Sequence, residues 1–333
     1  MAEFDTQGGK FTFCCGDYAP VMDVKGTVTS ELLDMIDDDE RVIYVLNDST
    51  GRNNRTWRYL TEKPGRILDV AIQEMNTITI CGALASKGYL PYYQTYGPFL
   101  TLHALDQVHN DICYNDFPVR LISTHAGVSS GYGPTHNTIL DFAMFNAMPN
   151  MTMVAPCDAI MAKKMLRASL DYPHPLCIRI PRGEEPNVYT DDTEYEYVFG
   201  RSITIAEGSD ITLIATGSMV YQSVQAARIL EEKGYDVGVI DMHTISPIDV
   251  PAILHAARHS NAIMTVEDHC IDGGLGTIVG DVLAQGGVAT RFKKVGLPSE
   301  FSPYAYPEEL YPHYKMDGPG IAENALKLML NLQ

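Results

Sequence analysis

Residue types suited to proton transfer and to binding a flat ligand gather in the first third of the chain. Glu74 lies among small and apolar residues, where an ionised carboxylate is costly unless it is paired. Tyr93, Tyr96 and Phe99 follow within one short segment, and aromatic rings of this kind can stack on a planar group. The same pattern also fits a carboxylate at a helix N-terminus and aromatic residues in a core.

Two histidines and several arginines could serve an anionic substrate. His125 and His136 bracket a loop rich in glycine and serine, AGVSSGYGPT, and histidines placed in this way suit proton transfer near neutral pH. Arg182 follows a predicted strand, although an arginine at a strand end is also often a solvated terminus. Arg52 and Arg55 are weaker candidates for the same anion site. Phosphate, sulfonate and carboxylate groups would all fit it.

Alternating strand-like and helix-like segments must position these side chains, and they predict an α/β fold with largely parallel sheets. In the first half of the chain, the predicted strands are 41–48, 89–96, 119–124, 151–158 and 176–183, and the predicted helices are 30–39, 70–88 and about 99–114. In an open sheet of this type, ligands bind at the carboxyl ends of the strands. Asp48, which ends the first strand, is therefore a further candidate for the binding site.

A polar, acidic segment with a proline, EEPNVYTDDTEYEY (184–197), predicts the boundary between a first domain, residues 1–190, and a second, residues 198–333. The second domain continues the alternation, with predicted strands at 210–218, 236–244 and 262–269 and predicted helices at 223–234 and 247–260. A glycine-rich turn, DGGLGTIVGDVL, follows. Alone it is a weak sign of nucleotide binding, and no acidic partner for a ribose stands at the right distance. We therefore interpret the second domain as structural.

Length and composition exclude several classes of partner. The chain has 333 residues, 45% of them hydrophobic, which is enough for two domains with a core each. A formal net charge of -18 disfavours nucleic acid and anionic membrane surfaces as partners. The chain has no run of about 20 apolar residues, the length that a membrane helix needs, and its N-terminal segment has no secretory pattern. The seven cysteines include no C-x-x-C pair, which predicts free thiols and a cytoplasmic location.

The segment DVAIQEMN (69–76) is similar to the D-V-G-I-x-E-x-N motif of thiamine-diphosphate enzymes, with Ala71 in place of the glycine. In those enzymes the glutamate hydrogen-bonds the aminopyrimidine ring of the cofactor and promotes the proton loss that activates it. TYGPF (95–99) is similar to T-F-x-x-F, whose rings pack on the pyrimidine. The resemblance implies that thiamine diphosphate is the cofactor and that it is bound by Glu74, Tyr96 and Phe99, with Asp48 as a further candidate.

The loop between the two histidines resembles the transketolase branch of these enzymes. Transketolases read T-H-D-S and then G-x-D-G-P-T-H-Q, whereas this chain reads THAG and then GYGPTHN, residues 131–137. In the family both histidines line the substrate channel, where they assist proton transfer and bind the anionic end of a sugar phosphate. The resemblance implies catalytic roles for His125 and His136, with His125 also binding substrate.

Arg182 and Tyr132 are the substrate-binding candidates that the resemblance adds, with Arg52 as a weaker one. IPRG (180–183) is similar to a family segment whose arginine binds a phosphate with two parallel hydrogen bonds. Tyr132 replaces an aspartate that reads a substrate hydroxyl, so the substrate is expected to differ from a standard pentose or hexose phosphate. Two further departures from the family pattern, at positions that normally hold an aromatic and a basic residue, are Leu102 and His103.

The second domain also resembles transketolases, in the segments EGSD, ATGS, SPID, VEDH and GGLG, and the family uses this C-terminal domain for subunit contact. The family holds the diphosphate and its metal with G-D-G and a downstream asparagine. Here only Gly16-Asp17 and Gly280-Asp281 occur, and neither is followed by glycine. The resemblance therefore implies that the diphosphate and Mg²⁺ or Ca²⁺ are held by a separate N-terminal-half subunit, that this chain holds no metal, and that the two form an α2β2 assembly.

The leading hypothesis is a β-type subunit of a heteromeric transketolase-like enzyme that moves a two-carbon ketol unit from an anionic ketose to an aldose. One alternative is a deoxyxylulose-phosphate-synthase-like subunit, and another is a 2-oxoacid-dehydrogenase β subunit. The latter usually has H-S-Q where this chain has THN (135–137). A third alternative, from another class, is a non-catalytic scaffolding subunit that keeps only the fold.

Overall fold

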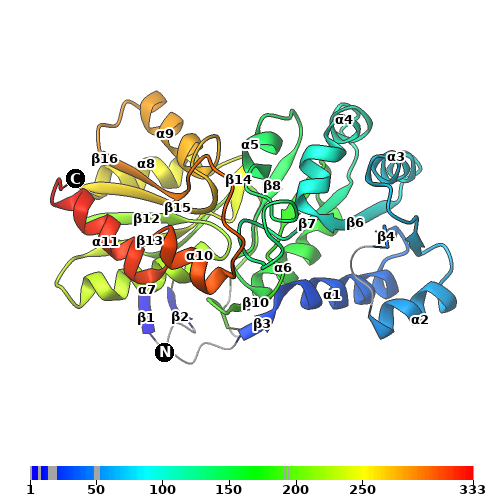
Figure 1. The fold of residues 1–333 in the computed structure, drawn as a ribbon, viewed down its shortest axis with the longest axis horizontal. Helices are drawn as coiled ribbons and strands as arrows, with labels where there is room; N and C mark the ends of the chain where they lie inside the picture. Colours follow the sequence, from blue (N-terminus) through cyan, green and yellow to red (C-terminus); the bar gives the residue numbers. More distant parts are fainter. Residues whose placement is uncertain are drawn as a thin grey trace.

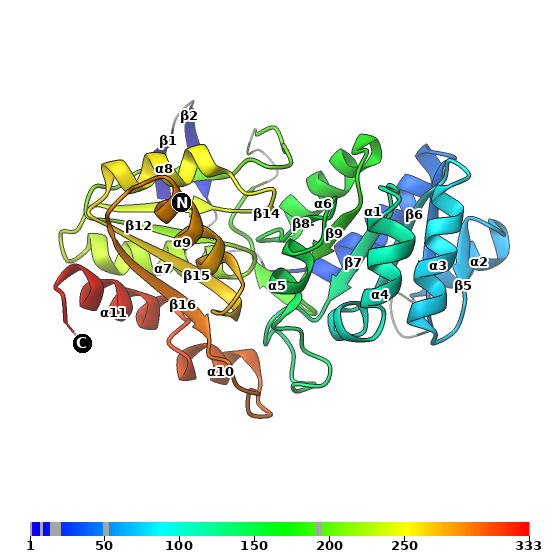
Figure 2. The same cartoon turned by 90° about the horizontal axis from the view of Figure 1, so that it is seen from above.

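A computed structural model of the chain describes residues 2–6, 9–13, 21–48, 53–190, 193 and 195–332. Two α/β units lie side by side, each with helices above and below its sheet (Figures 1 and 2). This arrangement confirms the predicted pair of doubly wound α/β domains. No helix within the described ranges combines the length and the apolar character that crossing a membrane requires.

The first unit is built on a seven-stranded sheet with the order β14-β8-β9-β7-β6-β4-β5. Its strands are β4 (Val42–Leu46), β5 (Ile67–Asp69), β6 (Leu90–Tyr96), β7 (Arg120–Thr124), β8 (Thr152–Val154), β9 (Leu176–Arg179) and β14 (Thr244–Ser246). All neighbours pair in parallel except β14, which joins from the second half of the chain. Because helices cover both faces, β4 and β7 are buried at every position, which explains their continuous apolar runs.

Helices and short turns complete the first unit. They are α1 (Val24–Asp38), α2 (Asn54–Glu62), α3 (Glu74–Ala85), η1 (Phe99–His103), α4 (Leu105–Gln107), η2 (Val108–Cys113), α5 (Asp141–Asn146), α6 (Ala159–Ala168) and η3 (Ser169–Asp171). A small ribbon joins β3 (Val21–Asp23) to β10 (Glu184–Pro186), so the two ends of this unit pair with each other.

The second unit has a five-stranded sheet with the order β11-β13-β12-β15-β16. Its strands are β11 (Ile203–Ala206), β12 (Ile211–Ala215), β13 (Val237–Asp241), β15 (Ala262–Cys270) and β16 (Arg291–Leu297), and its helices are α7 (Met219–Glu231), α8 (Val250–His259), α9 (Leu275–Gln285), α10 (Pro307–His313) and α11 (Gly318–Met329). Only β11 pairs antiparallel. A separate hairpin of β1 (Ala2–Thr6) and β2 (Gly9–Phe13) lies near β11.

Several predicted helix boundaries are wrong, for identifiable reasons. The helix predicted over 70–88 begins only at Glu74, because Ala71 adopts a φ of 61° in the left-handed region. The helix predicted over 30–39 begins earlier, at Val24, where the Asp23 carboxylate accepts a hydrogen bond from the Gly26 amide. The helix predicted over about 99–114 is divided into η1, α4 and η2, because Ala104 leaves the helical region.

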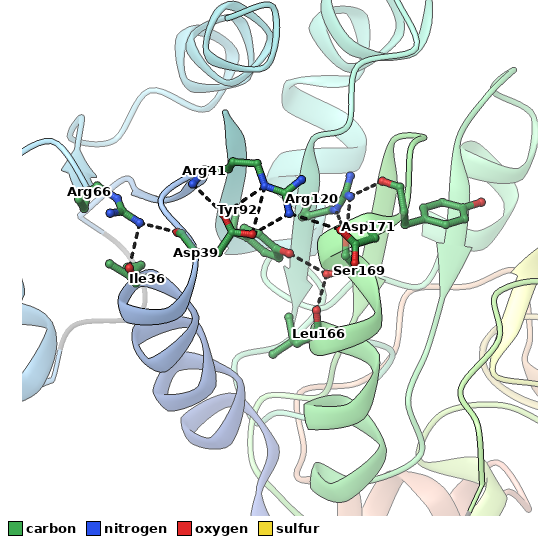
Figure 3. A network of polar contacts seen from close by, with 10 residues as sticks. Ile36, Asp39, Arg41, Arg66, Tyr92, Arg120, Leu166, Ser169 and Asp171 are labelled. Atoms are coloured by element: carbon green, nitrogen blue, oxygen red, sulfur yellow. Dashed lines mark hydrogen bonds and ion pairs between the residues drawn. The ribbon is translucent and has the colours of Figure 1, made fainter. Parts of the chain in front are cut away.

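A polar network holds the amino edge of the first sheet (Figure 3). The wholly buried Arg120 donates hydrogen bonds to the carbonyl oxygens of Ser169 and His174, at 3.1 Å each. The Tyr92 hydroxyl lies 2.8 Å from Ser169 Oγ, which in turn donates to the carbonyl of Leu166. These bonds tie the end of α6 to the starts of β6 and β7, so this edge is occupied by structural contacts.

The described cysteines are all buried and free, as predicted, and they are Cys81, Cys113, Cys157, Cys177 and Cys270. Cys14 and Cys15 lie outside the described residues. For Cys81 and Cys177, burial raises the thiol pKa. Both thiols therefore stay protonated near neutral pH and fit the packing role of a small apolar residue.

Buried carboxyl groups predict an alkaline loss of stability. Burial raises the pKa of Glu267 to about 8 and that of Asp241 to about 7. Between pH 4 and these values the folded chain binds more protons than the unfolded chain, so stability falls as pH rises. Burial lowers the pKa of His243 and His269 to about 4, which reduces stability below about pH 6.5.

We therefore expect the melting temperature of the chain to be highest near pH 6 and to fall toward pH 8.5, by roughly 2–4 °C for each kcal/mol lost. Thermal unfolding followed by circular dichroism across this range tests the expectation. E267Q removes one of the two carboxyl groups and should flatten the alkaline limb. An equally steep fall in that variant would contradict the assignment.

Candidate active site

The carboxyl edge of the first sheet collects the candidate residues from neighbouring strands. Asn47 follows β4, Tyr96 ends β6, His125 follows β7 and Arg182 lies three residues beyond β9. Since β6 pairs with both β4 and β7, and Tyr96 stands opposite Thr124, these strand ends are adjacent. The edge is thus the site that the parallel topology predicts.

Glu74 is the first residue of α3 and is only 3% exposed. Its Oε1 accepts a hydrogen bond of 3.0 Å from Asn47 Nδ2, and the same Asn47 nitrogen lies 3.1 Å from Thr95 Oγ1. Its Oε2 lies 3.5 Å from His103 Nδ1. The carboxylate is therefore fixed from β4 on one side and from η1 on the other, directly beside the strand that ends in Tyr96.

Four rings surround the strand end of Tyr96. The ring centroid of Tyr96 lies 5.5 Å from Phe99, 4.2 Å from His125 and 5.6 Å from His136. His136 also lies 5.6 Å from Phe99, edge to face, and His125 stacks on Tyr132 at 5.5 Å. The structure thus brings together both aromatic residues and both histidines that the sequence singled out.

Arg182 closes the cluster through Tyr132. Its guanidinium lies 4.3 Å from the centre of the Tyr132 ring, and Nη2 donates a hydrogen bond of 2.7 Å to the hydroxyl of the same residue. Two predicted substrate-binding residues are therefore in contact with each other. Because Tyr132 also stacks on His125, the arginine, the phenol and the imidazole form one continuous wall of the site.

Lys25 is a site residue that no sequence motif revealed. It lies in the first turn of α1, and the pairing of Asp23 with Glu184 in the β3–β10 ribbon brings it close to Arg182. Burial and the charge of Arg182 lower the pKa of Lys25. Two cations that repel each other at the mouth of a histidine-lined site, in a chain of net charge -18, indicate a local anion site.

The hydrogen bonds of His125 fix its tautomer. Thr124 Oγ1 donates its single hydrogen to the carbonyl of Thr95, so it accepts at 2.8 Å from His125 Nδ1. The proton of the neutral ring is therefore on Nδ1, and the buried Nε2 is an acceptor that no described residue satisfies. Burial first, and then the charges of Lys25, Arg182 and His136, lower the pKa of His125 to about 3.

We expect His125 to remain neutral from pH 8 down to pH 5. Nitrogen-edited NMR of the imidazole in the isolated chain measures this directly. Replacing neighbouring positive charge in K25M should raise the pKa, because one of the groups that oppose protonation is gone. Titration of the wild-type ring near the ordinary value of about 6.5 would contradict the prediction.

The remaining candidates lie at different distances from this cluster. Asp48 ends at the same edge, with an exposed side chain and a φ of 63°, and its buried neighbour Asn47 makes the contact with Glu74. Arg52 lies outside the described residues. Arg55 forms an ion pair with Asp34 on α1, away from the histidines. The roles assigned to Asp48 and Arg52 stay predictions.

Tyr93 and Leu102 differ from the other aromatic and apolar candidates. Tyr93 points away from the site and is buried in the core under α3. Leu102 is exposed and borders a cavity of about 290 Å³ between the segments 98–102, 134–140 and 299–302.

The glycine-rich turn of the second domain binds a side chain of its own. Both oxygens of Glu267 accept backbone amides at the start of α9, from Leu275 at 2.7 Å and Gly276 at 2.8 Å. A methyl group at Gly274 would lie 2.0 Å from Glu267 Oε2, so the turn needs glycine there. A nucleotide phosphate would compete with this carboxylate, which supports a structural role for the turn.

The donor set at the carboxyl edge fits a planar, nitrogen-containing ring. Such a ring offers hydrogen bonds to a fixed carboxylate, which Glu74 supplies, and a flat face to aromatic side chains, which Tyr96 and Phe99 supply. The orphaned Nε2 of His125 marks where a substrate hydroxyl can donate a hydrogen bond. Fold and site together define a two-domain α/β protein that binds a heterocyclic cofactor and a small anionic substrate.

Comparison with known proteins assigns the family. Residues 21–187 match the transketolase pyrimidine binding domain, and residues 200–321 match the transketolase C-terminal domain. The chain belongs to the transketolase family, as its motifs indicated.

Three individual proteins illustrate the similarity. One of the subunits of apulose-4-phosphate transketolase from Phocaeicola vulgatus is 34% identical over 302 residues, which is 90% of this chain and 96% of that protein. A solved structure described as a split gene transketolase, inactive beta4 tetramer, has a TM-score of 0.85 and 26% identity over 94% of this chain and 100% of that one. The 1-deoxy-D-xylulose-5-phosphate synthase of Symbiobacterium thermophilum is 34% identical over 276 residues, 83% of this chain but 42% of that protein.

Proposed function

We propose that this chain is the C-terminal-half, β-type subunit of a thiamine-diphosphate-dependent enzyme that transfers a two-carbon ketol unit from an anionic ketose to an aldose. The observation that carries the proposal is the Glu74–Asn47 pair beside the Tyr96–Phe99 rings, on the same sheet edge as the two histidines. Similarity over nearly the whole chain to one subunit of a two-subunit type of transketolase supports it.

The residues of this chain divide the work of the reaction. Glu74 would bind the aminopyrimidine ring and move a proton there, and Tyr96 with Phe99 would orient the ring. Bound thiamine diphosphate supplies the nucleophilic carbon that carries the ketol unit. His125 Nε2, neutral and unsatisfied, would accept a hydrogen bond or a proton from a substrate hydroxyl, with His136 facing it across the Tyr96 ring.

A partner chain would complete the site. Among the described residues, no group of three or more histidine, cysteine, aspartate or glutamate side chains could hold a metal, so we assign Mg²⁺ or Ca²⁺ and the diphosphate to an N-terminal-half subunit. Apolar side chains around Glu74 are exposed, with Ile72 at 67%, Met75 at 44% and Leu102 at 62%. A surface of this kind beside a buried carboxylate suits a subunit contact. The inactive β4 tetramer of the split relative is consistent with a chain that associates but needs its partner.

The anion site suggests the substrate class. Lys25 and Arg182 lie next to His125, so we propose that they bind the phosphate, sulfonate or carboxylate of an open-chain sugar. Tyr132 bonded to Arg182 changes the hydroxyl-reading position relative to the usual aspartate. The relative named for apulose 4-phosphate makes that branched sugar phosphate the first ketose to test.

The test is reconstitution. The chain is produced alone and together with a chain that carries G-D-G and the downstream asparagine, and each preparation is assayed with thiamine diphosphate, Mg²⁺ and a panel of ketose phosphates, sulfonates and carboxylates. We expect ketol transfer only with both chains. A partner variant lacking the G-D-G aspartate controls for assembly without metal binding. Turnover by the chain alone would overturn the split-enzyme proposal.

The synthase similarity gives a second candidate reaction, because the match to 1-deoxy-D-xylulose-5-phosphate synthase is of equal identity. Pyruvate with an aldose phosphate is therefore included as a donor–acceptor pair. Release of CO₂ from pyruvate without ketol transfer would favour the synthase-like reaction. A complex that binds cofactor but consumes neither donor would favour the scaffolding role.

A further inference from the structure

The histidine loop, residues 125–138, is held in an unusual conformation. His125 and Gly127 have φ values of 63° and 57°, in the left-handed region that residues other than glycine rarely adopt. The ends of the loop bond to each other, with the Gly127 amide 2.7 Å from the Thr138 carbonyl and the Thr138 amide 3.0 Å from the His125 carbonyl. A backbone held this way needs support from its surroundings.

The second domain provides that support through Asp268 of β15. Both carboxylate oxygens accept the Val128 amide, at 3.0 and 3.2 Å, and Oδ2 also accepts the Tyr311 hydroxyl from α10 at 3.0 Å. Asp268 is only 3% exposed. A methyl group on Gly127 would lie about 2 Å from this carboxylate, so the loop backbone packs directly against it.

Neighbouring contacts from β15 hold the far end of the same loop. The Cys270 amide donates to the Ile139 carbonyl at 2.9 Å. Arg179 Nη2 bridges the carbonyls of Asp268, at 2.7 Å, and Thr138, at 3.2 Å. Both ends of the histidine loop are therefore fixed to one strand of the other domain, and the Asp268 carboxylate is the side chain that reaches into the loop.

We propose, on the basis of the function proposed above, that Asp268 is a positioning residue: it holds the histidine loop so that His125 and His136 face the substrate. The second domain then contributes to the active site as well as to subunit contact. Asp268 touches neither histidine side chain and acts only through the backbone between them.

Amide hydrogen exchange on the isolated chain tests the clamp without requiring activity. In D268A the Val128 amide loses a buried acceptor, a loss of about 1–3 kcal/mol, so its exchange should accelerate by roughly 10- to 100-fold. D268N keeps an oxygen for Val128 and turns a donor toward the Tyr311 hydroxyl, so it should restore most of the protection. E267Q, which alters the adjacent buried carboxylate on the same strand, should leave the loop unchanged.

The kinetic arm uses the reconstituted two-chain enzyme. Because the loop carries both histidines, D268A should lower kcat by about 10²-fold while the KM for cofactor stays unchanged, with D268N near wild type. Should D268A fail to fold, Y311F removes one bond to the same carboxylate and should raise loop exchange by about threefold to tenfold. A more exposed loop in an inactive wild-type complex would support the clamp and count against the proposed function.

Unchanged exchange of residues 125–138 in D268A would overturn the clamp, as would an equal effect of E267Q. If D268A does not fold, unchanged exchange in Y311F overturns it. Lost protection with a full kcat in D268A would refute the positioning role, because the histidines would then not depend on the clamp.

Discussion

Replacing Glu74 with glutamine should reduce ketol transfer by the reconstituted enzyme by about 10³-fold, within the range that a general acid–base group contributes. Glutamine can still accept the hydrogen bond of Asn47 Nδ2, so the start of α3 should keep its geometry. What it cannot do is take up and return a proton. The loss is therefore expected in kcat, measured at saturating cofactor and substrate.

Two comparisons give this result its meaning. N47A leaves the carboxylate but removes one of its two neighbours, so a smaller loss of about tenfold is expected from mispositioning. E267Q removes an equally buried carboxylate far from the site and should keep full kcat. Activity of E74Q within tenfold of wild type would point to the scaffolding alternative, since the chain would then contribute no proton transfer.

The parallel strands of the first domain were predictable because each is buried on both faces. VIYVL in β4 and RLIST in β7 are continuous runs with no exposed position, and such runs are visible in a sequence. The start of α3 was not, because the left-handed backbone of Ala71 depends on its surroundings. The helix α6, which was not predicted, does carry a local signal: Asp158 caps it, and apolar residues recur at helical spacing.

The site was predictable where its residues follow one another in a motif. Glu74, Tyr96, Phe99 and both histidines come from short segments whose order reflects the order of the strands. Lys25 could not be found in this way, because it reaches the site through the pairing of Asp23 with Glu184, two segments far apart in the chain. The contact of Asp268 with Val128 joins different domains and likewise leaves no local pattern.

Removing the two cations should weaken anionic substrates selectively. A hydrogen bond to a charged group contributes about 1.5–3 kcal/mol, so R182A should raise the KM of the anionic ketose by roughly 10- to 100-fold. K25M should act in the same direction, and the double variant should exceed either alone. Since neither residue holds Glu74, kcat at saturation should change little.

The charge of the substrate decides whether this interpretation holds. An uncharged acceptor such as glycolaldehyde makes no use of an anion site, so its KM should be the same in R182A and wild type. R55A is the matched control, because that arginine is already paired with Asp34 on α1. If R182A weakens charged and uncharged substrates equally, then the arginine acts by holding Tyr132 against His125, the route to which the 2.7 Å bond and the ring stacking point. Raising the salt concentration separates the two cases, because screening weakens an exposed charge pair but leaves packing unaffected.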